Sequence, residues 1–99
     1  MSVLIIGKFP GDTAVFQKAL TDRAGELADV AEQARGAGCL HHRFGVGDGF
    51  VVLEDEWESA QQFEQFFTRP EIQALVGGMG ASGPPDITVV EAVTSPDQF

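Results

Sequence analysis

The segment from Phe50 to Phe67 constrains the fold more than any other because its hydrophobic period changes halfway. Four consecutive apolar residues, Phe50–Leu53, are typical of a strand that is buried on both faces. In the second half the apolar residues recur at helical spacing, at Phe63, Phe66 and Phe67. A strand that is apolar on both faces needs cover on each. The segment therefore predicts a helix layer on one face of a sheet and a second cover on the other.

The remaining pattern predicts an α+β chain in the order β-α-β-β-α-β, which is the ferredoxin-like order with helices on one face of an antiparallel sheet. Gly47-Asp48-Gly49 is typical of a hairpin turn. The Gly- and Pro-rich segment from Gly77 to Pro85 predicts a mobile loop that could close over a ligand. The expected strands are Val3–Phe9, Cys39–Val46, Phe50–Trp57 and Ile87–Val93, and the expected helices run from Asp12 or Thr13 to Arg35, from Ser59 to Thr68 and over the short Glu71–Val76.

Length and charge limit the function classes. The 99 residues predict one domain, 1–99, with 94–99 as a tail, and they carry six basic and fifteen acidic side chains. Nucleic acid is not expected as a partner, because phosphate binding needs clustered Lys and Arg. No apolar run approaches the about 18 residues of a membrane span, and the start has no basic leader, so we expect a cytoplasmic protein. The single cysteine, Cys39, excludes an intrachain disulfide and a cysteine-based zinc site and is expected in the core.

The expected strands do not alternate cleanly between apolar and polar residues. Val3 and Ile5 would point to one face of the sheet, while Leu4 and Ile6 would point to the other. An exposed apolar patch of several hundred square ångströms is rare on a monomer. We therefore expect a homodimer in which a second copy covers the open sheet face by two-fold symmetry. The alternative is a monomer with an apolar face.

Several segments together suggest a known family. They are Gly38–Phe44, Asp55–Ser59, Phe63–Phe67, Pro84-Pro85 and the final Val90–Val93. In these segments the chain resembles the antibiotic biosynthesis monooxygenase-like proteins of the dimeric α/β-barrel group. The resemblance implies a homodimer whose two sheets face one another. It also implies a cavity in each subunit, between the sheet and the helices.

The resemblance also implies an activity. Quinone-forming members of this group oxidise polycyclic aromatic phenols with molecular oxygen and no cofactor, and they use a tryptophan, an asparagine and a tyrosine around the substrate. Trp57 falls at the matching tryptophan, but the chain contains no tyrosine and no asparagine. Haem-degrading relatives take an iron ligand from the second helical region, and no histidine lies between Ser59 and Gly83. The chain is thus expected to be a cofactor-independent monooxygenase for an apolar aromatic substrate or, alternatively, a non-catalytic homodimer that binds a small hydrophobic ligand.

His41 and His42 are the candidate catalytic residues. Neighbours on a strand point to opposite faces, so one is expected in the cavity and the other on the dimer side. A histidine can act as a general base toward a phenol or enol. The alternative is a structural histidine that pairs with a cross-strand carboxylate such as Glu54 or Glu56.

The candidate substrate-binding residues are Arg43, Trp57, Phe63 and Phe67. The Arg43 guanidinium could hold a carboxylate or phenolate, or it could instead pair with the acidic run Glu54–Glu56, which is expected to be a solvated strand end. Trp57 and the phenylalanines could line a pocket, with the indole N–H as its polar group, or could be plain core. The acidic run lacks the spacing of a calcium loop, so no metal is expected.

Overall fold

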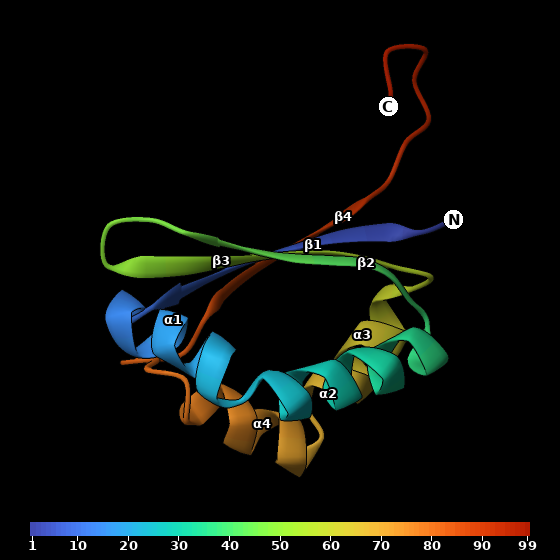
Figure 1. Cartoon of the computed structure of the whole chain (residues 1–99). Coiled ribbons are helices and arrows are strands. Elements are labelled where there is room, and N and C mark those ends of the chain that lie inside the picture. Colours follow the sequence, from blue (N-terminus) through green and yellow to red (C-terminus); the bar gives the residue numbers. More distant parts are fainter.

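A computed structural model describes all residues, 1–99, and places four strands in one sheet with four helices against it. The sheet order is β2-β3-β1-β4, and every neighbouring pair is antiparallel. Figure 1 shows the sheet nearly edge-on with all four helices on the same side. The predicted fold class is confirmed. The elements are β1 (Val3–Pro10), α1 (Thr13–Asp22), α2 (Ala24–Ala37), β2 (Cys39–Val46), β3 (Phe50–Trp57), α3 (Ala60–Phe67), α4 (Pro70–Gly77) and β4 (Asp86–Glu91).

The first helical region is divided into two helices, where the sequence pattern predicted one helix that Gly25 could bend or fray. The chain leaves helical geometry at Arg23, with φ −115° and ψ 25°, and turns before α2 begins. Gly25, two residues later, has a low helix propensity and weakens the helix at this point. The turn gives α1 and α2 different directions along the sheet. α2 then ends at Gly38, whose φ of 116° is the left-handed geometry that glycine adopts readily.

The helix starts follow local chemistry. Asp12 accepts hydrogen bonds from the backbone N–H groups of Ala14 and Val15 and so caps α1. Ser59 caps α3 by accepting from the Gln62 backbone N–H at 3.1 Å, as the sequence predicted.

The last strand ends at Glu91, two residues earlier than the prediction of Val93. Glu91 pairs with Val3, the first residue of β1, so beyond it no regular partner strand remains. The backbone N–H of Ala92 still donates a hydrogen bond to the Ser2 carbonyl oxygen. Beyond it the tail leads away from the body of the molecule (Figure 1).

The two faces of the sheet have different cover. On β1, Ile5 is fully buried against the helices, whereas Leu4 and Ile6 on the other face remain 37% and 40% exposed. On β3 the buried residues alternate with more exposed ones in the same way, which confirms the predicted division between the faces. The side of β3 that faces the helices carries Val51, Leu53, Asp55 and Trp57.

The segment expected to be a mobile loop after α4 is tied to the end of β1. Asp12 N donates to Gly80 O at 3.0 Å, and Ser82 N donates to Pro10 O at 2.9 Å. Gly11 and Ala81 form an isolated β-bridge. These bonds make residues 79–81 a fixed wall beside the sheet. None of the helices combines the length and the apolar character that a membrane span requires.

Candidate functional site

A cavity of about 580 Å³ lies between the sheet and the helices. Its volume is within the range of small-molecule sites, roughly 300–1,000 Å³. Of its 21 lining residues, 17 are hydrophobic. α2 contributes Leu27 and Val30 to the wall as well as the small Ala28, Ala31 and Ala34. No residue of α2 is buried, whereas α3 and α4 each bury two large side chains, so the space lies on the α2 side of the helix layer.

A buried carboxylate, Asp55, is the main polar feature of the cavity wall. It is 4% exposed and lies two residues before Trp57 on β3, so both side chains point into the helix-covered face. Asp55 Oδ2 accepts a hydrogen bond from Trp57 Nε1 at 3.0 Å, and Oδ1 lies 2.6 Å from His42 Nδ1. Both carboxylate oxygens therefore have a partner. We call His42, Asp55 and Trp57 the relay.

The relay gives His42 a defined chemistry. Burying a carboxylate is strongly unfavourable unless its oxygens are hydrogen-bonded, and the two partners of Asp55 meet this requirement. When Asp55 is ionised, His42 Nδ1 carries the proton that bonds Oδ1, and Nε2 is left as the basic nitrogen. The His42 side chain is 40% exposed, so a ligand in the cavity can reach this nitrogen. Its ring stands edge-on to Phe44, with the ring centres 4.7 Å apart.

A β-bulge at Leu40 decides which histidine joins the relay. Cys39 pairs with Trp57, but His41 already pairs with Glu56, so one residue of β2 is unpaired between them. Regular pairing from Cys39 onward would instead have placed His41 opposite Asp55. With the bulge, His42 lies opposite Asp55. The His41 ring borders the cavity but turns toward the open face, where Nε2 is 3.7 Å from Glu54 Oε1.

Sequence reasoning missed Asp55, which was grouped with a solvated acidic strand end. That interpretation is wrong for Asp55, because its position alternates in phase with the buried Val51 and Leu53. The phase is visible in the sequence and was the signal that could have identified it. The alternative in which a histidine pairs with Glu54 or Glu56 fits His41, which lies near Glu54, whereas the partner of His42 is Asp55.

The aromatic candidates come together on the cavity wall. Trp57 is 1% exposed and packs against Phe63 and Phe66, with ring centres 5.7 and 5.5 Å away. Phe63 in turn stacks on Phe67 at 5.3 Å. The indole N–H, which was expected to be the polar group of the pocket, is already bonded to Asp55. Within the relay, the polar atom left without a partner is therefore Nε2 of His42.

Arg43 is not part of this group. In the register of β2 and β3 it lies opposite Glu54, which places it on the open face of the sheet. It also forms no ion pair within 4.0 Å, although such a pair with the acidic run was the alternative expectation. A ligand held in the cavity does not meet this guanidinium.

Cys39 lies in the core below the cavity. Burial, with a smaller effect of the Asp55 charge, raises the pKa of its thiol to about 11, and Sγ donates to the His41 carbonyl oxygen at 3.3 Å. The thiol therefore stays protonated at neutral pH and is a poor nucleophile. No group of three His, Cys, Asp or Glu side chains is arranged to hold a metal ion.

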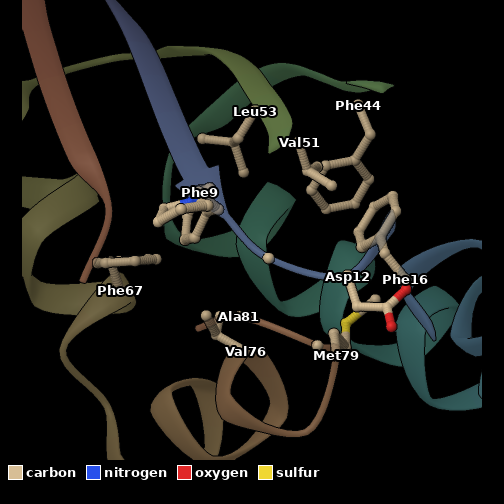
Figure 2. Close-up of a pocket in the computed structure, with 13 residues that line it drawn as sticks. Phe9, Asp12, Phe16, Phe44, Val51, Leu53, Phe67, Val76, Met79 and Ala81 are labelled. Atoms are coloured by element: carbon tan, nitrogen blue, oxygen red, sulfur yellow. The ribbon is translucent and has the colours of Figure 1, made fainter. Parts of the chain in front are cut away.

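A second, smaller cavity of about 70 Å³ adjoins the first. Figure 2 shows Val51, Leu53 and Phe44 reaching it from the sheet, with Val76 and Met79 on the opposite side.

Comparison with solved structures identifies the architecture. A monooxygenase from Streptomyces coelicolor, in complex with the ligand nanaomycin D, matches 99% of this chain and 93% of its own, with 22% identity and a TM-score of 0.70. SnoaB, a cofactor-independent oxygenase from Streptomyces nogalater, matches 98% of each chain with 14% identity and a TM-score of 0.67. An antibiotic biosynthesis monooxygenase matches 95% of this chain and 100% of its own with 17% identity and a TM-score of 0.60.

Neither a family model nor a curated protein matches the sequence. The likeness therefore rests on the structures, and it extends over nearly the whole of each chain. At these sequence identities it identifies the fold and not an activity. The chain has the ferredoxin-like fold of the antibiotic biosynthesis monooxygenases, as the resemblance in its sequence predicted.

Proposed function

We propose that this chain is a cofactor-independent oxygenase that binds a small apolar aromatic phenol or enol in the main cavity, with His42 as the general base. The observation that carries the proposal is the relay. It is a buried carboxylate that orients one partly exposed histidine in a cavity whose other walls are almost entirely apolar. Neither a metal nor an organic cofactor has a role in the proposed reaction.

The cavity favours a flat, apolar ligand. Phe63, Phe66 and Phe67 present aromatic surfaces from α3, and Leu27 and Val30 present aliphatic surfaces from α2. Each square ångström of apolar ligand surface that leaves water contributes about 25 cal/mol to binding. One hydroxyl on the ligand, placed at His42 Nε2, fixes its orientation.

The proposed chemistry balances without a further reductant. His42 Nε2 takes a proton from the substrate, and Asp55 stabilises the imidazolium that forms. The resulting carbanion or phenolate gives electrons to dioxygen and forms a carbon–oxygen bond, and the proton returns from His42 to give a hydroperoxide. The carbon that now carries the hydroperoxide keeps one hydrogen, and loss of that hydrogen with the outer OH as water converts it to a carbonyl. One oxygen atom enters the product, the other leaves as water, and all four electrons come from the substrate.

A non-catalytic role is the second candidate. It is favoured by the sequence itself, which contains no tyrosine and no asparagine, the residues that the quinone-forming relatives are expected to place around the substrate. In this case the same cavity binds a small hydrophobic ligand and releases it unchanged. The apolar walls support both candidates, and only turnover separates them.

Oxygen consumption and ligand binding measured together test the proposal. Trp57 is the only tryptophan and no tyrosine is present, so fluorescence reports directly on the cavity wall. A panel of polycyclic phenols is titrated without oxygen, and turnover is then followed with an oxygen electrode. Binding followed by uptake of one dioxygen per product supports the oxygenase. Binding without uptake favours the ligand-binding role, and quenching by no member of the panel contradicts both.

We also propose that the chain acts as a homodimer in the cytoplasm, with the open sheet face as the interface. The apolar side chains of Leu4, Ile6 and Val90 are 37–44% exposed on that face. Cover by a second copy would remove them from water. The free thiol of Cys39 suits a reducing compartment. Sedimentation that gives the mass of one chain at micromolar concentration contradicts the dimer.

A further inference from the structure

The small cavity beside the proposed substrate site is lined almost entirely by carbon. Its wall includes the rings of Phe9, Phe16 and Phe44 (Figure 2), and among its 13 lining residues only Asp12 carries a charge. The carboxylate of Asp12 is already used, because Oδ1 accepts from the first backbone N–H groups of α1 at 3.0 and 3.2 Å.

The backbone polar groups around the small cavity also have partners. Gly11 N donates to Gly49 O at 3.2 Å, Asp12 N donates to Gly80 O at 3.0 Å, and Ser82 N donates to the carbonyl oxygen of Pro10 at 2.9 Å. A buried water needs about two to four polar partners to be stable. These bonds occupy several of the polar groups at the rim, and the rest of the lining is mostly apolar, so a water inside the cavity finds few partners.

The volume selects the kind of molecule that fits. An apolar cavity of about 150 Å³ accepts benzene or xenon. At about 70 Å³, this one is too small for an aromatic ring but has room for a diatomic molecule. A diatomic molecule without hydrogen bonds to lose, such as dioxygen, gains by leaving water for such a space. We propose that the small cavity holds dioxygen next to the aromatic substrate, an inference that rests on the proposed oxygenase function.

The position of the small cavity supports delivery to the reacting carbon. Five residues line both cavities: Phe44, Leu53, Phe67, Val76 and Met79. The Phe44 ring lies 5.0 Å from the Phe16 ring on the side of the small cavity and 4.7 Å from the His42 ring on the other. One partly exposed phenylalanine ring thus separates the stored dioxygen from the base. A change of its rotamer would join the two spaces.

Paramagnetic relaxation tests the occupancy without any turnover. Dissolved dioxygen at elevated pressure shortens the NMR relaxation times of the methyl groups that it contacts. We expect the methyls of Val51, Met79 and Ala81, which line the small cavity, to relax faster than those of Ile5, which is buried but lines neither cavity. Their relaxation enhancement should also exceed that of the exposed Val93 methyls, which meet dioxygen only from the solvent. Enhancement at Val51 and Ala81 no greater than at Val93 would overturn the proposal.

Two substitutions at one position change the volume in opposite directions. Val51→Ile adds a methylene to the small cavity and should reduce the relaxation enhancement at Ala81 and Met79. Val51→Ala enlarges the cavity and should increase it. The Val93→Ile control adds the same methylene to the exposed tail and should change neither. Proton–nitrogen spectra establish that each variant keeps its fold.

The kinetic consequence separates this inference from the proposed function. In Val51→Ile the KM for dioxygen should rise about threefold, by more than any change in kcat, because a ground-state binding site has been filled. An oxygenase with the same KM for dioxygen in wild type, Val51→Ile and Val51→Ala would overturn the dioxygen site and leave the proposed function intact. Relaxation enhancement at Val51 in a protein that oxygenates nothing would support the dioxygen site and contradict the oxygenase.

Discussion

His41 and His42 are adjacent in β2, yet the two faces of the sheet give them different environments. His42 lies 2.6 Å from a carboxylate that is 4% exposed, inside an apolar cavity. His41 lies 3.7 Å from Glu54 on the face that the helices leave open. The carboxylate of Glu54 is 64% exposed, so solvent weakens its interaction with His41, whereas the bond from His42 to the buried Asp55 is shielded on the carboxylate side. Residue type alone thus does not set the chemistry of a histidine, because the cover on its face decides it.

The largest expected difference is catalytic. His42→Gln removes the base and should lower kcat/KM by about 100-fold or more, since general-base catalysis contributes roughly 100- to 10,000-fold. His41→Gln is the matched control on the opposite face and should change kcat/KM less than about twofold, in keeping with an exposed group outside the relay. Steady-state oxygen uptake measures both. Equal losses in the two variants would contradict the assignment of His42.

The carboxylates of Asp55 and Glu54 should contribute unequally to the free energy of unfolding. Asp55→Ala leaves the Trp57 indole N–H without its partner in a buried site and should lower the free energy of unfolding by about 2–3 kcal/mol. Glu54→Ala removes an exposed group and should cost less than about 0.5 kcal/mol. Urea unfolding followed by Trp57 fluorescence measures both. Similar midpoints would mean that the burial of Asp55 contributes little to the fold.

The open face can be tested by adding a charge to it. Ile6→Glu places a carboxylate among apolar side chains and should weaken the proposed dimer by at least about tenfold, because the charge must lose its water on association. Glu71→Gln on α4, on the helix side of the sheet, changes a charge away from the interface and is the control. Sedimentation equilibrium across a concentration series gives both dissociation constants. A dimer unaffected by Ile6→Glu would place the interface elsewhere.

The effect confined to the narrowest range of conditions, high pH, concerns the buried thiol on the cavity side. The folded pKa of Cys39 is raised to about 11 from an ordinary value of 9.0, so the fold favours the protonated form. Its contribution to stability is therefore complete below pH 9 and is lost as the pH rises through about 11. Wild type should lose more stability than Cys39→Ala between these values. If the free energy of unfolding falls equally in both proteins over this pH range, the titration of Cys39 is not the cause of the loss.

Much of the fold could be predicted because its signals are local. The change of period after Phe50, the cap at Ser59 and the hairpin glycines each depend on residues within a few positions of one another. A weak point at Gly25 was predicted, but the full division of the helix at Arg23 was not, since the stripe of apolar residues continues across it. The early end of β4 depends on where β1 begins, which is a distant part of the chain.

The candidate site could be predicted only in part. Trp57 and the histidine pair were found because the chain has one tryptophan and two histidines, and Phe63 and Phe67 were found because they lie at helical spacing. Asp55 was not found, because three acidic residues in a row suggest exposure to solvent. Only the alternation of burial along β3 separates the middle residue of the three from its neighbours.

The sequence by itself determined the order of elements, the class of fold and which residues of a strand share a face, because side-chain direction alternates with a fixed period of two. The tertiary structure decided that His42, and not His41, meets Asp55. The bulge at Leu40 shifts the register of β2 by one residue, and such a shift exchanges the two faces for every side chain after it. It also decided that a cavity exists, because α3 and α4 bury large side chains against the sheet whereas no residue of α2 is buried, and this leaves space on the α2 side.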